Sequence, residues 1–283
     1  MVDTQPFFIV SSGRSGTHAL AKALSLYENV DMHHEYCVDY IQPLAFEYYH
    51  RLINEGEAIE TIQGTYGSAV ALSEKPLWGD SSNKASWIIH PLLKVFPNAK
   101  FIWLVRDGRK VVSSYFNKLS EECYDDRSVN WMRLWIENSE RYTQPPPEKK
   151  YWWPMPPHRL YCYNESPSQF RLICWHWNAI NEFIDYNLSW VPEENTFVVK
   201  LEDLTNGDMG TLNDMLNFLG LSWNDEVYDI LQVPDNVSTP QDFSLTSEQI
   251  IEFWKSCRPT MEIFDYKEDE EYSIDYHPEG WDK

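Results

Sequence analysis

Residues 7–20 read FFIVSSGRSGTHAL, an apolar run that leads through a glycine-containing turn into a helical pattern. The apolar run predicts a strand over residues 7–10, and the stripe that follows predicts a helix over residues 15–26. Glycines let the backbone turn tightly with its N–H groups pointing inward, and the helix adds the positive end of its dipole. The segment therefore predicts an anion-binding cradle made by Ser12, Gly13, Arg14, Ser15, Gly16, Thr17 and His18.

This cradle lies in a strongly acidic chain. The 283 residues carry 23 Lys and Arg against 44 Asp and Glu, a net charge of −21, but residues 4–27 contain no acidic residue. The overall charge excludes a protein that binds nucleic acid over a broad basic face, and it disfavours a polyanionic ligand. No apolar run approaches the roughly 18 residues that span a bilayer, so we also expect no membrane partner.

The spacing of the glycines separates the cradle from the phosphate loop of nucleotide triphosphatases. That loop has four residues between its glycines and then Lys-Ser or Lys-Thr. Here only Arg14 and Ser15 separate Gly13 from Gly16, and no lysine follows. Without that lysine and a metal-holding acid, ATP chemistry lacks its usual supports. An ordinary strand-to-helix turn that binds no ligand is the alternative interpretation.

A second basic segment reads KFIWLVRDGRKVVSSYFNK over residues 100–118. It predicts a buried strand over 100–105 and a helix over 109–118, and it holds five basic residues against one acidic residue. Arg106 at the end of the strand and Ser114 in the helix suit a second anion. Because ligands bind beyond the carboxyl ends of parallel strands, we expect this site beside the cradle. The alternative is an Arg–Asp pair that caps the helix.

Apolar runs and helical patterns alternate along the rest of the chain. Further strands are predicted over 30–33, 77–79 and 196–201, and further helices over 41–53, 86–96 and 209–219. The alternation predicts an α/β three-layer sandwich with a central parallel sheet flanked by helices. We expect a single domain over residues 1–283, with an aromatic and proline-rich excursion at about 120–165 and an acidic tail at about 266–283.

Both basic segments resemble motifs of sulfotransferases that use 3′-phosphoadenosine 5′-phosphosulfate (PAPS). FFIVSSGRSGTHAL resembles the 5′-phosphosulfate loop, and FPNAKFIWLVRDGRKVVSSYF resembles the 3′-phosphate motif, whose Arg and Ser fall on Arg106 and Ser114. FVVKLEDLTNGDMGTLNDMLNFLGL and FWKSCRPTMEIFDY are similar to later segments of the family. The resemblance implies a P-loop-NTPase-like fold, PAPS as donor and 3′,5′-adenosine bisphosphate (PAP) as product. We expect no metal, because fixed donors in the cradle can stabilise the charge on the leaving phosphate. The Arg-Ser-Gly-Thr form of the loop looks more like the carbohydrate and tyrosyl-protein branch than the small-phenol branch.

The chain departs from the family pattern at two positions. The family often has Gly-Asp-Lys-Ser/Thr-Pro where this chain has GDSSNK over residues 79–84, so Ser81 stands at the expected lysine. Lys84 is a candidate replacement for that lysine. Leu201 stands where a tyrosine often precedes Glu-Asp-Leu, which removes a hydrogen bond expected near the adenine.

A general base is expected near the cradle, since sulfuryl transfer must remove a proton from the acceptor hydroxyl. The resemblance places the catalytic carboxylate of the branch on Glu35, and we assign to Arg14 the stabilisation of the leaving phosphate. His33 and His34 are alternative bases. Adjacent residues of a strand point to opposite faces, so these two histidines and Glu35 are not expected to form a metal site.

The acceptor is expected to be a neutral or cationic compound with a hydroxyl group, because the chain is acidic. Candidate aromatic side chains for stacking against it are Trp152, Trp153, Trp175 and Trp177. A nucleotide or small-molecule kinase and a non-catalytic nucleotide-binding protein are the competing functions. The five scattered cysteines lack CxxC spacing, and the chain shows no secretory leader, so we expect a cytoplasmic protein.

Overall fold

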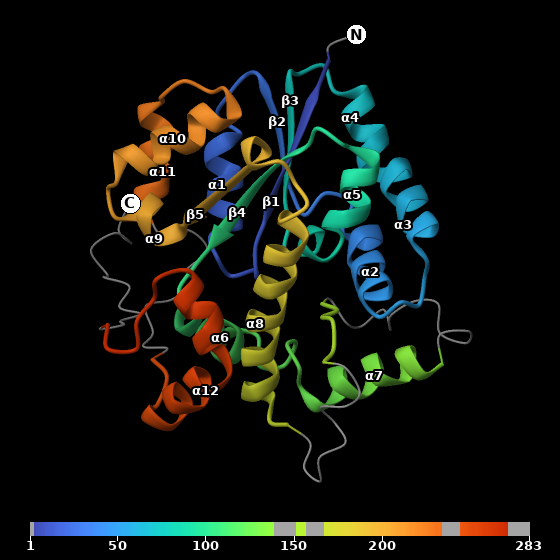
Figure 1. The fold of residues 1–283 in the computed structure, drawn as a ribbon, viewed down its shortest axis with the longest axis vertical. Helices are drawn as coiled ribbons and strands as arrows, with labels where there is room; N and C mark the ends of the chain where they lie inside the picture. The colour runs from blue at the N-terminus through green and yellow to red at the C-terminus, as the bar shows by residue number, and fades with distance from the viewer. Residues whose placement is uncertain (1–2, 139–150, 157–166, 234–243, 271–283) are drawn as a thin grey trace.

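The computed structural model describes residues 3–138, 151–156, 167–233 and 244–270 of the chain. Its centre is a five-stranded sheet in the order β2-β3-β1-β4-β5, in which all neighbouring strands run parallel. The strands are β1 (Gln5–Val10), β2 (Val30–His34), β3 (Leu77–Ser81), β4 (Lys100–Val105) and β5 (Thr196–Lys200). The expected α/β sandwich with a central parallel sheet is confirmed (Figure 1).

The strand order places a topological switch beside β1. The chain leaves β1 toward β2 and β3 on one side and then crosses to β4 and β5 on the other. β1 pairs with β3 through Phe7 and Gly79, and with β4 through Phe8 and Phe101. Ligands of open parallel sheets bind beyond the carboxyl ends of the strands at such a switch. The segments that follow β1 and β4 therefore border the expected binding crevice.

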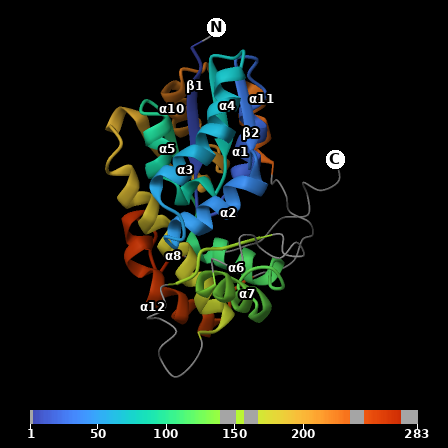
Figure 2. The same ribbon diagram turned by 90° about the vertical axis from the view of Figure 1, so that its right-hand side faces the viewer.

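Helices cover both faces of the sheet (Figure 1). One face is covered by α1 (Thr17–Leu24), α9 (Leu201–Thr205), α10 (Met209–Leu219) and α11 (Asp225–Gln232). The other face is covered by α2 (Val38–Tyr49), α3 (Glu55–Ile62), α4 (Ser68–Leu72), α5 (Ile89–Val95) and part of α8 (Gln169–Leu188). Figures 1 and 2 show three further helices beyond the carboxyl ends of the strands: α6 (Gly108–Lys118), α7 (Asp126–Glu137) and α12 (Ser247–Ile263).

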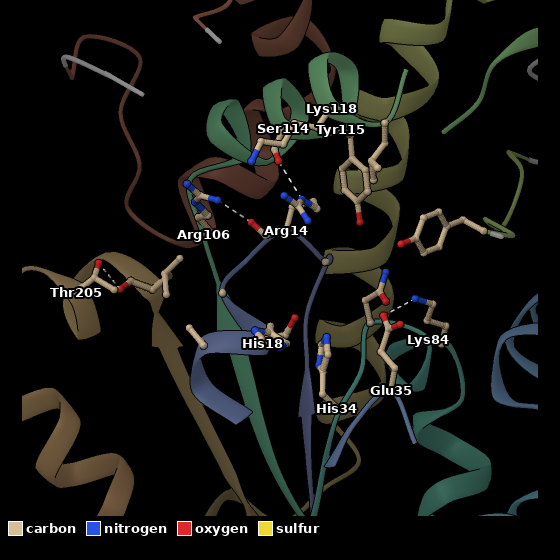
Figure 3. A pocket seen from close by; sticks show the side chains of 18 of the residues that line it. Arg14, His18, His34, Glu35, Lys84, Arg106, Ser114, Tyr115, Lys118 and Thr205 are labelled. Carbon is tan, nitrogen blue, oxygen red and sulfur yellow. Dashed lines mark hydrogen bonds and ion pairs between the residues drawn. The ribbon is translucent and has the colours of Figure 1, made fainter. Parts of the chain in front are cut away.

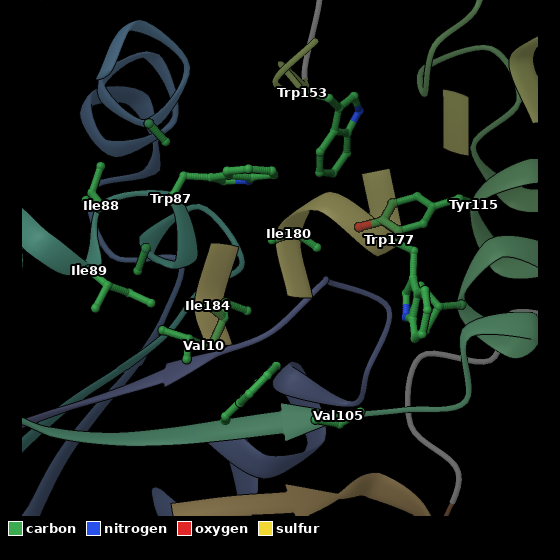
Figure 4. Packing of buried hydrophobic residues seen from close by; sticks show 14 of the residues in the cluster. Val10, Trp87, Ile88, Ile89, Val105, Tyr115, Trp153, Trp177, Ile180 and Ile184 are labelled. Carbon is green, nitrogen blue, oxygen red and sulfur yellow. The ribbon is translucent and has the colours of Figure 1, made fainter. Parts of the chain in front are cut away.

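The two faces of the sheet have different cores. Along β1, Phe7 packs on the α1 side and Phe8 on the α8 side, as the two-residue period of a strand requires. The buried side chains on the α1 side are mostly aliphatic, whereas those on the α8 side include many aromatic rings. Figure 4 shows Ile180 of α8 within this aromatic cluster, together with Trp87 and Trp177. The cluster also includes residues of α6 and α7, so rigid rings continue past the strand ends.

The strongest sequence patterns predict their elements closely. β4 and α10 have the predicted bounds, and β5 ends one residue before the predicted end. The helix predicted over 86–96 is divided into a 3₁₀ turn at Ala85–Trp87 and α5, because Ile88 leaves the helical region with φ −128°. No element is predicted over α3, α4, α7, α8 or α11. Helix α8 packs against α6 and α12 as well as the sheet side, so its buried positions do not form one narrow apolar stripe.

Some of the predicted features are only partly described by the structure. The excursion over about 120–165 contains α7 and residues 151–156, while 139–150 and 157–165 lie outside the described residues. The same holds for residues 271–283 of the predicted acidic tail and for Cys162. The four cysteines within the described ranges, Cys37, Cys123, Cys174 and Cys257, form no disulfide with one another. Across the described part of the chain, no helix combines the length and apolar character needed to cross a bilayer.

Candidate active site

A cavity of about 400 Å³ lies at the carboxyl ends of the strands (Figure 3). Side chains from the segments after all five strands line it. Most of the site residues expected from the sequence are among them: Gly13, Arg14, Gly16, Thr17, His18, His34, Glu35, Arg106 and Ser114. Ser12, Ser15 and His33 were expected there too, but they are not among the lining residues. The structure therefore brings both basic segments and the candidate base Glu35 to one cavity.

The cradle after β1 requires glycine at two positions. Gly13 and Gly16 have φ values of +76° and +83°, a left-handed conformation that residues with a Cβ rarely adopt. A Cβ on Gly13 would overlap the Tyr115 hydroxyl and lie 2.8 Å from the Asn83 side-chain amide nitrogen. A Cβ on Gly16 would lie 2.5 Å from Leu201 Cδ1. Both glycines thus allow a left-handed turn without strain at these two positions and a close approach of neighbouring side chains.

The hydroxyls of Ser12 and Ser15 lie inside the turn. Their two Oγ atoms are 3.0 Å apart, and Ser15 Oγ donates to the Gly13 carbonyl at 3.0 Å. Tyr115 Oη donates to the Ser12 carbonyl at 2.9 Å, which ties the turn to α6. These contacts stiffen the cradle from within, so the side chains of both serines are placed away from the cavity surface.

Helix α1 presents its amino end to the cavity. The helix begins at Thr17 with Gly16 as its N-cap, and no described side chain caps its first N–H groups. Its first turn also contains no acidic residue. Uncapped N–H groups and the positive end of the dipole favour an anion at this position.

The two basic segments meet directly in the cavity. Arg14 Nε donates to Ser114 Oγ at 2.9 Å, and Arg106 Nη1 donates to the Arg14 carbonyl at 2.8 Å (Figure 3). Lys118 lines the same cavity one helical turn after Ser114. Burial lowers the pKa of Lys118, and the nearby Arg14 and Arg106 lower it further. This side of the cavity is therefore strongly electropositive.

The Arg–Asp pair that formed the alternative interpretation of the second segment involves Arg109, not Arg106. Asp107 is the N-cap of α6 and accepts from the Arg109 backbone N–H at 2.8 Å. Its carboxylate also accepts from Arg109 Nη2 at 2.7 Å, and both side chains are buried. Asp107 is thus engaged with Arg109, while the guanidinium of Arg106 reaches the cavity.

Glu35 and Lys84 form an ion pair on the opposite side of the cavity (Figure 3). Lys84 is only 4% exposed, and its Nζ lies 5.4 Å and 5.6 Å from the ring centres of Tyr151 and Trp153. Ser81, at the position where a lysine was expected, is fully buried and donates through Oγ to the Thr17 carbonyl at 3.1 Å. Lys84 rather than residue 81 therefore brings an amine to the cavity.

The two candidate histidines lie in different environments. His34 lines the cavity, with Nδ1 2.8 Å from the Ser81 carbonyl and its ring 5.3 Å from that of His18. Burial lowers the pKa of His34, although the neighbouring Glu35 acts in the opposite direction. His33 instead packs against the Trp78 ring at 5.2 Å and pairs with Asp31 at 3.1 Å. Only His34 of the two faces the cavity.

Several lining residues were not expected from the sequence: Ala19, Asn83, Tyr115, Lys118, Leu119, Tyr151, Thr205, Leu231, Gln232 and Val233. Lys118 follows Ser114 by four positions, and helical spacing alone was sufficient to place both on one face. Of the four candidate tryptophans only Trp153 lines the cavity. Trp152 packs against Trp135 with ring centres 5.5 Å apart. Residues 231–233 carry no sequence signal for a site.

Comparison with known proteins identifies the family and supports the fold. The model of the sulfotransferase family matches residues 6–161, more than half of the chain. Among solved structures, the sulfotransferase domain from the curacin biosynthetic pathway is similar, with 14% identity and a TM-score of 0.52 over 94% of this chain and 99% of that chain. A sulfotransferase from Mycobacterium avium has 14% identity and a TM-score of 0.51 over 93% of this chain and 78% of that chain.

A sulfotransferase from Alicyclobacillus acidocaldarius is similar to the same extent, with 14% identity and a TM-score of 0.50 over 94% of this chain and 98% of that chain. No curated protein sequence matches the chain. The solved structures share the fold, and the family model spans the cradle, the Glu35 turn and the Arg106 segment. On this evidence the chain belongs to the sulfotransferase family.

Proposed function

We propose that this sulfotransferase moves the sulfuryl group of PAPS to a hydroxyl group of a neutral or cationic acceptor. The contact between the two basic segments carries the proposal. Arg14 Nε donates a hydrogen bond to Ser114 Oγ, and Arg106 Nη1 donates one to the Arg14 carbonyl. A donor with separate 5′ and 3′ anionic groups needs two anion sites within one cavity. The −21 net charge supports an acceptor that is not a polyanion.

The residues that line the cavity provide a site for each part of such a donor. We assign the 5′-phosphosulfate to the cradle at Gly13–Gly16 and to the amino end of α1. The 3′-phosphate is assigned to Arg106 and Ser114, with the donor geometry of a guanidinium and a hydroxyl. Apolar lining at Leu201 and Leu231 suits the adenine ring.

Bound PAPS supplies an activated sulfuryl group in position for in-line transfer. Arg14 and the N–H groups of α1 stabilise the negative charge that develops on the leaving phosphate oxygen. Glu35 accepts the proton of the acceptor hydroxyl, and Lys84 orients its carboxylate through the ion pair. His34, which lines the same cavity, is the alternative base.

Ligand-induced stabilisation tests the donor assignment against the kinase alternative. PAP at a hundredfold excess over its Kd stabilises the folded state by about 2.7 kcal/mol. At about 2–4 °C per kcal/mol for a chain of this size, the melting temperature is expected to rise by about 5–10 °C. A rise with ATP and Mg²⁺ but none with PAP would overturn the proposal in favour of a kinase. No rise with either would favour a protein that binds neither nucleotide.

Transfer of label from [³⁵S]PAPS to components of a cell extract, followed by identification of the labelled product, tests the acceptor class. A labelled carbohydrate or tyrosyl residue is expected if the Arg14 form of the cradle and the position of Glu35 reflect that branch of the family. A labelled polyanion would contradict the charge argument.

We also propose that the protein acts in a reducing compartment such as the cytoplasm. The four cysteines within the described ranges form no disulfide with one another, which supports this proposal.

A further inference from the structure

We propose that Asp80 is a positioning residue that holds the turn carrying Glu35 in the conformation needed for proton transfer. This inference rests on the proposed function, because it takes Glu35 as the base. Asp80 touches neither the cavity nor Glu35 through its side chain, and none of the steps described above uses it.

Asp80 is a fully buried carboxylate near the end of β3. Its Oδ1 accepts from the Tyr36 backbone N–H at 3.0 Å, and its Oδ2 accepts from Tyr66 Oη at 2.8 Å. Burying an ionisable group is unfavourable unless hydrogen bonds compensate for the lost water. One donor belongs to the turn that carries Glu35, and the other belongs to the segment around Tyr66. The Asp80 carboxylate therefore connects these two segments.

The turn that Asp80 holds has an unfavourable backbone conformation. Glu35 and Cys37 have φ values of +55° and +50°, in the left-handed region that residues with a Cβ rarely adopt. Such residues persist only where surrounding contacts determine their conformation. Tyr36, which lies between them, is the residue whose N–H binds Asp80.

Two consecutive residues of β3 bind two consecutive amides of this turn. The Ser81 carbonyl accepts from the Glu35 N–H at 3.2 Å, and the Asp80 carboxylate accepts from the Tyr36 N–H. The backbone of Glu35 is therefore held on both sides, and its side chain is left to pair with Lys84. Without the Asp80 contact, the left-handed turn loses one of the two hydrogen bonds that tie its amides to β3.

Tyr66, the second hydrogen-bond donor to Asp80, is held rigidly in the core. It lies in a π-helical turn, Gln63–Gly67, between α3 and α4 and is fully buried. Its ring packs edge-on against Phe8 and Trp78 at 5.4 Å and 5.6 Å. Single π-helical turns occur frequently at functional sites, where they redirect a side chain. Here the turn aims the phenol at Asp80.

The charged groups around Asp80 link it to the same ion pair. Burial raises the pKa of Asp80 to about 7, while the hydrogen bonds from Tyr36 and Tyr66 oppose that rise. Glu35 raises this pKa further, and Lys84 lowers it. The charges of Glu35 and Lys84 therefore both affect the pKa of Asp80, although Asp80 binds the Glu35 turn through the Tyr36 backbone N–H.

The test compares Asp80→Ala, Asp80→Asn and Tyr66→Phe with wild type, with Tyr27→Phe as the matched control. The Tyr27 hydroxyl donates to the Ser222 carbonyl, and neither residue lines the cavity. For each protein, kcat is measured with PAPS and tyramine, a cationic phenol that is protonated at neutral pH, as the probe acceptor, and the Kd for PAP is measured by calorimetry. Crystal structures of wild type and of each variant that folds report the conformation at Glu35.

Asp80→Ala is expected to lower kcat by about 10- to 100-fold, because small displacements of a catalytic group have effects of that size. The Kd for PAP should stay within about twofold, since the cradle and Arg106 are untouched. Asp80→Asn and Tyr66→Phe should lower kcat less, and Tyr27→Phe should not change it. In the crystal structures, Glu35 should leave the left-handed region or lose its contact with Lys84.

An unchanged Glu35 conformation in the Asp80 variants, or an equal loss of PAP affinity and kcat, would overturn the positioning role. If Asp80→Ala does not fold, Asp80→Asn and Tyr66→Phe decide by the same criteria. A wild-type protein that neither binds PAP nor turns over PAPS would overturn the proposed function instead. The crystal structures would still decide whether Asp80 holds the turn.

Discussion

The two walls of the cavity are held together in different ways. The cationic wall consists of Arg14, Arg106, Ser114 and Lys118, and direct hydrogen bonds join its two strand–turn–helix segments. The ion-pair wall consists of Glu35 and Lys84, and it depends on a left-handed turn supported from behind by Asp80. One wall gathers positive charge, whereas the other pairs opposite charges beside the rings of Tyr151 and Trp153.

This difference implies that the two walls affect different steps, namely donor binding and proton transfer. A cluster of cations binds anions whether or not a reaction follows, so the cationic wall should determine donor affinity, with Arg14 also stabilising the leaving phosphate during transfer. A carboxylate on the other wall contributes little to holding an anion, so its effect should fall on the rate of proton transfer. Substitutions that separate affinity from turnover therefore test whether the two walls differ as proposed.

The largest effect is expected for Glu35→Gln on the ion-pair wall. Removal of a general base lowers turnover by about 100- to 10,000-fold, while the Kd for PAP should stay within about twofold. Steady-state kinetics with labelled PAPS and calorimetry with PAP measure the two quantities. Normal turnover of Glu35→Gln would exclude Glu35 as the base and direct attention to His34.

The next effect concerns the stability of the cradle turn after β1. Gly13→Ala adds backbone strain and an overlap with Tyr115, each unfavourable by about 1–3 kcal/mol, so the free energy of unfolding should fall by roughly 2–6 kcal/mol. Urea unfolding measures the change. Gly64→Ala is the matched control, because a Cβ there has no neighbour within 4 Å. Equal changes in the two variants would contradict a special requirement at Gly13.

Arg106→Ala on the cationic wall should weaken PAP binding by about 10- to 100-fold, since it removes a charged hydrogen-bond donor. The kcat at saturating PAPS should change much less. Lys110→Ala is the matched control, because it removes one positive charge from the same segment but does not line the cavity. If both variants weaken binding equally, net charge rather than the Arg106 position would explain the affinity.

The cationic wall could be predicted from the sequence because each of its halves is local. A strand, a glycine-containing turn and a helix follow one another within residues 7–20 and again within 100–118. Parallel strands end at the same edge of a sheet, so both halves were expected to be neighbours once β1 and β4 pair. What local patterns did not indicate is that the hydroxyls of Ser12 and Ser15 turn inward and that Arg14 has a positive φ of +53°.

The ion-pair wall was only partly predictable, for a physical reason. The resemblance indicated Glu35, but its orientation depends on positive φ angles at non-glycine residues, which have no sequence pattern. Asp80 acquires its role from Tyr36 and Tyr66, which are 44 and 14 positions away in the chain. Contacts of this kind exist only after the core has formed around them.

A further effect is a pH-dependent difference in stability between Asp80→Asn and wild type. Burial raises the pKa of Asp80 from 3.8 to about 7 in the folded state. Between these values the folded state holds a proton that the unfolded state has lost, so this group's stabilisation of wild type declines as pH rises from about 4 to about 7. Asparagine does not titrate and lacks this decline.

The melting temperature of Asp80→Asn minus that of wild type should therefore increase by roughly 10 °C from pH 4 to pH 7 and level off above it. Burial lowers the pKa of His176 to about 3 and that of His50 to about 4, so both histidines make the protein less stable as pH falls. They are present in both proteins and cancel in the difference. Scanning calorimetry at several pH values measures it, and a difference independent of pH would mean that Asp80 is not protonated near neutral pH. In that case the ion-pair wall would carry a second permanent negative charge behind Glu35, and the contrast with the cationic wall would be sharper than proposed.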